Sequence, residues 1–146
     1  MSLEQHLSNE QLSAIAAEYG TPVYVYNADK ITSQYQQLTT AFAGQQVRFF
    51  YACKALTNPH ILRHVHSMGA GIDCSSINEV KLALYAGAQP ANILYTSNGI
   101  AFDEIAEAVI LGVHVNIDSL SNLEKFGARF GNSYPVGLRL RPNIMA

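Results

Sequence analysis

The strongest constraint on the fold is a regular alternation of strand-like runs with amphipathic, helix-like segments. The strand-like runs are short, rich in β-branched or aromatic residues, and bounded mostly by Gly, Pro, Asn or Ser. They are Val23–Tyr26, Val47–Cys53, Gly71–Cys74, Ile93–Thr96, Val113–Ile117 and Val136–Leu140. Alternating strands and helices predict parallel strands joined by right-handed crossovers. The sequence therefore predicts an α/β fold built on a parallel sheet.

The segments between these runs carry helix-capping signals. A helix is expected over Asn9–Tyr19, because Ser8 and Gln11 can form a capping box and Gly20 can end the helix. Asn58-Pro59 and Ser76 are expected to open two more helices, since Asn and Ser cap well and Pro fits a first turn. Further helices are expected near 102–111 and 121–130.

Two architectures satisfy such an alternation, an open doubly wound sheet and a closed barrel. The nearest match to a nucleotide-binding glycine turn, Gly69–Cys74, lacks the third glycine and precedes a strand instead of following one. This favours a (β/α) barrel. A complete eight-stranded barrel takes roughly 250 residues, whereas this chain has 146 residues and five or six strand-like runs. We therefore expect residues 1–146 to be the N-terminal portion of a TIM-type barrel that continues beyond this chain.

Composition excludes several classes of protein. Nine Lys and Arg against eleven Asp and Glu give a formal charge of −2, which offers no basic surface for nucleic acid. No apolar run reaches the roughly 18 residues that a membrane-spanning helix needs. The start of the chain lacks a signal-peptide pattern, and two cysteines make no disulfide framework. The sequence therefore predicts a cytoplasmic protein.

Lys54 is the residue whose position points most directly to chemistry. It ends the run Val47–Cys53, and strand alternation would place Phe50, Ala52 and Lys54 on one face. In a barrel that face can point inward, and active sites lie at the carboxyl ends of the strands. An enclosed lysine loses hydration of its ammonium, which favours the neutral, nucleophilic amine. A lysine that extends from a strand end into solvent is the alternative that spacing alone leaves open.

Two further charged residues lie in other predicted strands, Asp73 toward the end of the next one and Arg139 in the last one. Asp73 could place a carboxylate beside a cofactor bound to the lysine, or it could accept a backbone N–H at the strand end. Arg139 shares a strand face with Gly137, and a guanidinium inside a barrel needs an anionic or acceptor partner. A cofactor oxygen could serve as that partner, as could an internal salt bridge with Asp73.

No metal site is expected from spacing. His60 and His64 stand four residues apart, but no Glu lies between them as the metalloprotease pattern requires. Cys53 and Cys74 lack the clustered spacing of a zinc site, so buried reduced thiols are expected. Glu79 is accounted for by a capping box at the start of its helix.

Four blocks resemble, in order and at compatible distances, the alanine-racemase-like barrel decarboxylases that depend on pyridoxal phosphate. They are Phe50–Pro59, which holds the lysine motif, Gly69–Glu79, Asn116–Glu124 and Leu138–Pro142. The run Leu12–Tyr26 is similar to the opening of the diaminopimelate decarboxylases within that family. The resemblance extends over nearly the whole chain, from Leu12 to Pro142.

This resemblance implies a cofactor, a reaction and residue roles. Pyridoxal 5'-phosphate would be the cofactor, held covalently by Lys54 until the substrate amine replaces the lysine. Asp73 would lie near the cofactor, and Arg139 close to its ring and phenolic oxygen. The implied reaction of the full-length protein is decarboxylation of meso-diaminopimelate to L-lysine, a step of lysine biosynthesis, in a cytoplasmic homodimer.

Three alternatives remain open. An ornithine- or arginine-type decarboxylase and a racemase would share the same lysine, and a truncated barrel without catalytic activity would share the same fold. The resemblance also implies that a ring-stacking histidine, a glycine-rich phosphate loop and a C-terminal β domain lie outside this chain. Residues 1–146 alone are therefore expected to be inactive.

Overall fold

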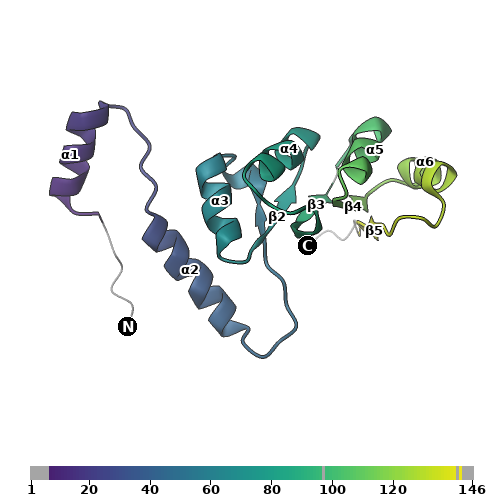
Figure 1. The fold of residues 1–146 in the computed structure, drawn as a ribbon, viewed down its shortest axis with the longest axis horizontal. Helices are drawn as coiled ribbons and strands as arrows, with labels where there is room; N and C mark the ends of the chain where they lie inside the picture. Colours follow the sequence, from purple (N-terminus) through teal and green to yellow (C-terminus); the bar gives the residue numbers. More distant parts are fainter. Residues whose placement is uncertain (1–6, 97, 141, 143–146) are drawn as a thin grey trace. The chain divides into compact units, whose positions relative to one another are not determined.

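A computed structural model describes residues 7–96, 98–140 and 142 of the chain. The chain divides into two compact units that meet between Val47 and Arg48 (Figure 1). Among the described residues, no helix has both the length and the apolar character needed to span a bilayer.

The first unit holds α1 (Asn9–Tyr19) and α2 (Ala28–Ala41). The prediction for α1 is confirmed at both ends. The Gln11 amide donates to Ser8 Oγ at 3.2 Å, the Ser8 amide donates to Gln11 Oε1 at 2.8 Å, and Gly20 caps the helix with φ +79°. The sequence analysis predicts no helix over α2, although its cap is typical: the Lys30 amide donates to Asn27 Oδ1 at 3.0 Å.

The strand predicted at Val23–Tyr26 is wrong. These four residues lie outside any strand, and their side chains are 39 to 89% exposed. Their β-branched and aromatic side chains have a high propensity for strands, but propensity alone does not form one. A strand also needs a neighbouring strand for pairing and packing, and none pairs with this segment among the described residues.

The second unit contains a five-stranded parallel sheet whose spatial order equals the chain order. Its strands are β1 (Phe50–Ala52), β2 (Gly71–Cys74), β3 (Ile93–Thr96), β4 (His114–Ile117) and β5 (Gly137–Leu138). Short 3-10 turns, η1 (Cys53–Ala55) and η2 (Pro90–Asn92), lie between elements. The connecting helices are α3 (Pro59–Ser67), α4 (Ile77–Tyr85), α5 (Phe102–Ile110) and α6 (Leu120–Phe130).

Strand order and helix placement decide between the two candidate architectures. A doubly wound sheet reverses its strand order and carries helices on both faces. Here the order runs from β1 to β5 without reversal, and α3 to α6 lie along one side of the strands (Figure 1). This is the arrangement of a barrel wall, as the sequence predicts.

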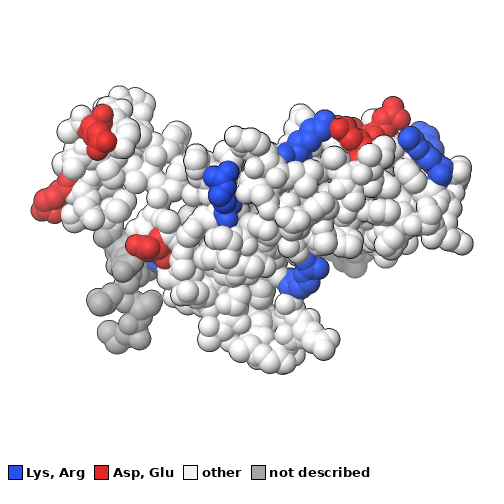
Figure 2. Space-filling model, viewed as in Figure 1, with Lys and Arg blue, Asp and Glu red and all other residues white. Residues whose placement is uncertain are grey.

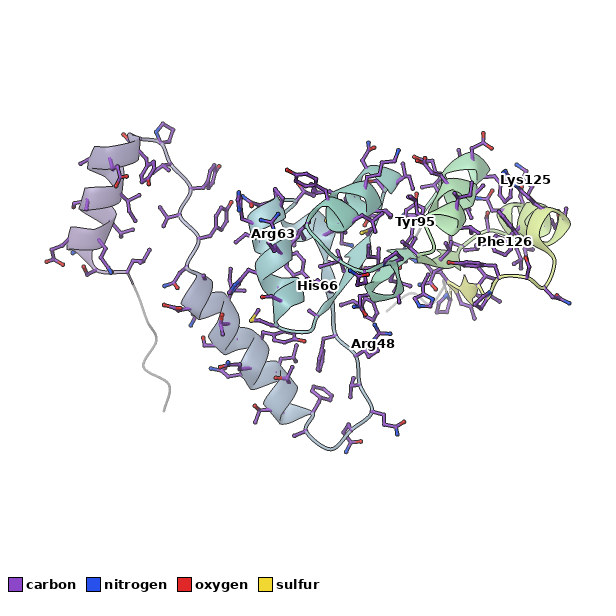
Figure 3. All side chains as sticks on the ribbon, viewed as in Figure 1. Arg48, Arg63, His66, Tyr95, Lys125 and Phe126 are labelled. Atoms are coloured by element: carbon purple, nitrogen blue, oxygen red, sulfur yellow. The ribbon has the colours of Figure 1, made fainter. Side chains whose placement is uncertain are left out.

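The core lies between the sheet and this layer of helices. Alternate residues of the central strands are fully or almost fully buried there: Ile72, Cys74, Ile93, Tyr95, Val115 and Ile117. Tyr95 of β3 and Phe126 of α6 are its two largest fully buried side chains (Figure 3). Burial of one face of each strand fixes the strand register, because a one-residue slip would turn these side chains outward. The remaining alternate positions point away from the helices.

At the amino ends of the strands, Phe50 lies across Gly71. A Cβ atom on Gly71 would stand 2.5 Å from two carbons of the Phe50 ring and 2.9 Å from the Asn92 carbonyl oxygen. The Arg48 guanidinium lies 5.2 Å from the centre of the Phe50 ring and donates to Asn92 Oδ1 at 2.8 Å. The missing side chain of Gly71 thus leaves room for the Phe50 ring, beside which Arg48 reaches Asn92 just before β3.

Gly71→Ala is expected to destabilise the protein by about 1–3 kcal/mol, since the added methyl group collides with a ring and a backbone carbonyl. The measurement is the urea midpoint of the purified variant. Gly127→Ala is the matched control, because a Cβ there meets nothing within 4 Å in the middle of α6. The control is expected to be neutral or stabilising. Equal midpoints for the two variants would contradict this account of Gly71.

Candidate functional site

A chain of polar side chains crosses three strands at the carboxyl end of the sheet, on the face without helices. Thr96 Oγ1 donates to Asp73 Oδ1 at 2.7 Å, and Asn116 Nδ2 donates to Thr96 Oγ1 at 3.2 Å. All three side chains are half-buried. Each comes from a different strand, β2, β3 or β4, so the sheet itself sets their spacing. The carboxylate of Asp73 is therefore held in one orientation.

Gly137 of β5 leaves room for the Asn116 side chain, the last member of this polar chain. It pairs with Asn116 in the β4–β5 register, and a Cβ atom at Gly137 would collide with the side-chain oxygen of Asn116. A larger residue would push the Asn116 amide away from Thr96. Glycine at this position therefore allows Asn116 to keep its hydrogen bond to Thr96.

Lys54 lies at the same end of the sheet, although not in a strand. β1 is shorter than predicted and ends at Ala52, and Cys53–Ala55 form the 3-10 turn η1, in which the Leu56 amide donates to the Cys53 carbonyl at 3.1 Å. The expected alternation of Phe50, Ala52 and Lys54 along one strand is therefore wrong for its last member. Ala52 pairs with Asp73, so the turn that carries Lys54 begins beside the Asp73 strand. The Lys54 side chain is exposed, so the described residues show the solvent-facing alternative and not the enclosed lysine expected from the strand pattern.

Arg139 follows the last residue of β5. Its amide donates to the Ile117 carbonyl at 2.9 Å and continues the β4–β5 ladder by one residue. Its exposed side chain lines a groove together with Asp118, Ser119 and apolar residues of β4, β5 and α6. The alternative of an internal salt bridge with Asp73 is wrong for the described side chains, which form no such pair.

The structure thus brings Asp73 together with Thr96 and Asn116, two residues that the sequence analysis missed. The available signal was their position, since both are polar residues near the ends of predicted parallel strands. Lys54, in the turn after β1, and Arg139, directly after β5, lie at the same sheet end, on the two sides of this polar chain.

On the opposite, helix-covered face, two thiols lie side by side. Cys53 and Cys74 are both fully buried, and their Sγ atoms lie within 4.8 Å of each other. Burial, reinforced by the negative charge of Glu79, raises the pKa of the Cys53 thiol to about 11. Burial likewise raises the pKa of the Cys74 thiol far above its usual range. Both thiols are therefore protonated at neutral pH.

Glu79 has a capping role that differs in part from the prediction. Its amide donates to Ser76 Oγ at 3.2 Å, as expected for the first turn of α4. Its carboxylate, however, accepts the Ser75 amide through Oε2 at 2.6 Å, and not the amide of Ser76. The carboxylate is thereby held over the end of β2.

The described part of the chain carries charged side chains of both signs. On the face drawn in Figure 2, Lys and Arg appear singly or beside acidic residues. One such pair is Lys81 with Glu107, whose Nζ and Oε1 atoms are 2.8 Å apart. This distribution agrees with the small net charge.

Comparison with known proteins identifies the family. The model of the pyridoxal-dependent decarboxylases, pyridoxal binding domain, matches residues 28–146. The chain belongs to this family. The matched region includes the whole sheet and every predicted site residue, and pyridoxal phosphate is accordingly the cofactor that the family binds.

Curated relatives give a narrower comparison. The chain is 44% identical over 128 residues to the diaminopimelate decarboxylase of Methanothermobacter thermautotrophicus. This alignment covers 86% of this chain and 29% of the relative. It is 36% identical over 139 residues to the diaminopimelate decarboxylase of Pseudomonas aeruginosa, in an alignment that covers 92% of this chain and 34% of the relative. The chain thus spans about a third of the length of these relatives.

Solved structures confirm the fold. Diaminopimelate decarboxylase from Helicobacter pylori in complex with L-lysine matches with a TM-score of 0.81 at 31% identity, over 91% of this chain and 35% of that one. Lysine/ornithine decarboxylase from Vibrio vulnificus in complex with cadaverine matches with a TM-score of 0.78 at 28% identity, over 91% of this chain and 36% of that chain. The predicted α/β class and the resemblance to barrel decarboxylases are both confirmed.

The described residues fit a pyridoxal cofactor in their donor chemistry. Lys54 presents an exposed primary amine, the group that bonds an aldehyde. Asp73 presents a carboxylate that Thr96 restrains through Oδ1. Both are at the carboxyl end of the sheet, where barrels of this kind place their active sites.

Proposed function

We propose that the complete protein carrying this chain is a pyridoxal-phosphate-dependent decarboxylase that converts meso-diaminopimelate to L-lysine. The observation that supports the reaction class best is an exposed lysine in the turn after β1, beside β2, whose Asp73 carboxylate accepts a hydrogen bond from the Thr96 hydroxyl. The substrate assignment rests on the similarity to diaminopimelate decarboxylases at 44% and 36% identity.

In this proposal Lys54 holds the cofactor and releases it to the substrate. Its exposed side chain leaves Nζ accessible for both steps. When bound, the pyridoxal ring serves as the acceptor for the electron pair left by departing carbon dioxide. All other contributions of this chain are binding, orientation and proton placement.

Asp73 and Arg139 are proposed to bind polar groups around the cofactor. Thr96 occupies Asp73 Oδ1, and Oδ2 then offers an acceptor for an ammonium group such as Lys54 Nζ or the substrate amine. The Arg139 guanidinium presents several donors in a planar fork, which suits an anionic oxygen. Its ladder bond to Ile117 fixes where the side chain departs from the sheet.

The remaining properties of the complete protein stay predictions. Residues 1–146 would form the first part of a barrel, with the rest of the active site supplied by later residues and by a second subunit of a homodimer. Location in the cytoplasm and the absence of a nucleic-acid partner are likewise expected from composition alone.

A direct assay tests the proposal. The complete protein, loaded with pyridoxal phosphate, is expected to release carbon dioxide from meso-diaminopimelate with a kcat/KM at least about tenfold above that for L-ornithine, L-arginine or L-lysine. A site built to pair a substrate's polar groups rejects analogues that leave these groups unpaired. The similarity to lysine/ornithine decarboxylase makes a preference for L-lysine or L-ornithine the second candidate. Exchange of the α-hydrogen without release of carbon dioxide would identify a racemase and contradict both.

A further inference from the structure

Two cysteines that stand far apart in the sequence become neighbours at the ends of β1 and β2. The last paired residues of these strands are Ala52 and Asp73, and Cys53 and Cys74 follow them directly. Both thiols point to the helix-covered side and are fully buried. Glu79 reaches the same place from the first turn of α4. The two Sγ atoms and a carboxylate oxygen of Glu79 all lie within 4.8 Å of one another.

This grouping escapes sequence analysis because the strands create it. The two cysteines belong to different βα units, so the short spacing of zinc-ribbon or zinc-finger cysteines is absent. In the folded chain, however, two sulfur atoms and one carboxylate oxygen converge. Thiolate and carboxylate together form a donor set for zinc-class cations, with metal–sulfur bonds near 2.3 Å and metal–oxygen bonds of about 2.0–2.2 Å.

We propose that Cys53, Cys74 and Glu79 bind a thiophilic divalent cation of the zinc class. On binding, both S–H bonds break, two metal–thiolate bonds form, and two protons pass to the solvent. The carboxylate supplies the third ligand, and a water molecule completes a tetrahedral set. No electrons are transferred.

The three donor atoms would balance the charge of a divalent cation, because two thiolates and a carboxylate are all anionic. A divalent charge at the centre stabilises two thiolates and a carboxylate at once. Because ligand protons must leave, the affinity for the ion is expected to rise with pH.

The carboxylate is already oriented for this role. The Ser75 amide donates to Glu79 Oε2 at 2.6 Å and restrains the side chain, one of whose carboxylate oxygens lies within 4.8 Å of both Sγ atoms. Such outer hydrogen bonds fix metal ligands in many sites. Glu79 is half-buried and Ser75 exposed, so the cluster approaches the surface on this side.

Cadmium ions provide the test, because cadmium–thiolate bonds absorb in the ultraviolet. Titrating the complete, reduced protein with Cd²⁺ is expected to develop this absorption with one ion per chain at this site. The difference between the wild type and the Cys53→Ser/Cys74→Ser variant isolates the site from any other thiols. An equal absorption and affinity in the two proteins would overturn the proposal.

Glu79→Gln tests the carboxylate while retaining both thiols. Loss of an outer-shell group typically costs 10–100-fold in metal affinity, so loss of a direct ligand should weaken Cd²⁺ binding at least about tenfold. Glu124→Gln is the matched control, because Glu124 is an exposed carboxylate on α6. Identical dissociation constants for the two Gln variants would exclude Glu79 as a ligand and overturn the three-ligand site.

A measurement on the wild type alone covers the case in which the cysteine variants fail to fold. Cd²⁺ is expected to protect the peptides containing Cys53 and Cys74 from alkylation together, and to release two protons per bound ion. Protection of neither peptide, or of one without the other, would refute a shared site. None of these readouts depends on decarboxylase activity, so they remain valid whatever the complete protein catalyses.

Discussion

Lys54→Ala is expected to abolish covalent attachment of pyridoxal phosphate to the complete protein and to lower decarboxylation at least about 10³-fold. The physical reason is that the variant removes the exposed amine at the carboxyl end of β1, the only group proposed here to bond the cofactor aldehyde. Borohydride reduction of the holoenzyme, followed by peptide mapping, measures the attachment. The wild type should carry the label on the peptide that contains Lys54.

Lys125→Ala is the matched control, an exposed lysine on α6 far along the chain from the site (Figure 3). It should retain both the label and the activity. A label on any residue other than Lys54 in the wild type would disprove the proposed role of Lys54. Normal activity of the Lys54→Ala variant would have the same consequence.

Thr96→Val is expected to lower kcat/KM about 10- to 100-fold while the protein stays folded. The substitution keeps the shape of the side chain but removes the hydroxyl that donates to Asp73 and accepts from Asn116. Asp73 would then lose its fixed orientation, because the bond to Asp73 Oδ1 and the bond from Asn116 Nδ2 would both be lost. Loss of orientation near reacting atoms is costly even when the displacement is about 1 Å.

Thr96→Ser separates positioning from packing, because it restores the hydroxyl and removes only a methyl group. Its activity should return to within a few-fold of the wild type. If Val and Ser reduce kcat/KM equally, the methyl group and not the hydrogen bond matters. An unchanged kcat/KM in Thr96→Val would show that the polar chain does not serve the reaction.

The parts of the fold that sequence predicts best are those governed by local chemistry. The limits of α1 follow from the Ser8–Gln11 capping box and from Gly20, all within a few residues of the helix. The central strands β2 and β3 occur at their predicted limits because their buried faces match the pattern of apolar residues. Capping and alternation are short-range signals, and they can be read without knowledge of the rest of the chain.

The predictions are wrong where the structure of a segment depends on residues far away in the sequence. Val23–Tyr26 has strand composition but no pairing strand among the described residues, and β1 ends at Ala52 because Cys53 turns into the core. For the site, strand-end reasoning selected Asp73 correctly as a residue at the carboxyl edge of the sheet. Its contact with Thr96 depends on the register of β2 against β3, which composition does not reveal. The approach of Cys53 to Cys74 likewise depends on the register of β1 against β2.

The match between strand order and chain order has a consequence for how the protein forms. Every strand pairs with the strand that follows it, at separations of about twenty residues, as in Phe50 with Gly71 and Asn116 with Gly137. Contacts between such near neighbours require little loop closure and favour rapid folding. During synthesis, each new βα unit can dock on the one before it as soon as it leaves the ribosome, so the wall can grow from its first strand toward its last.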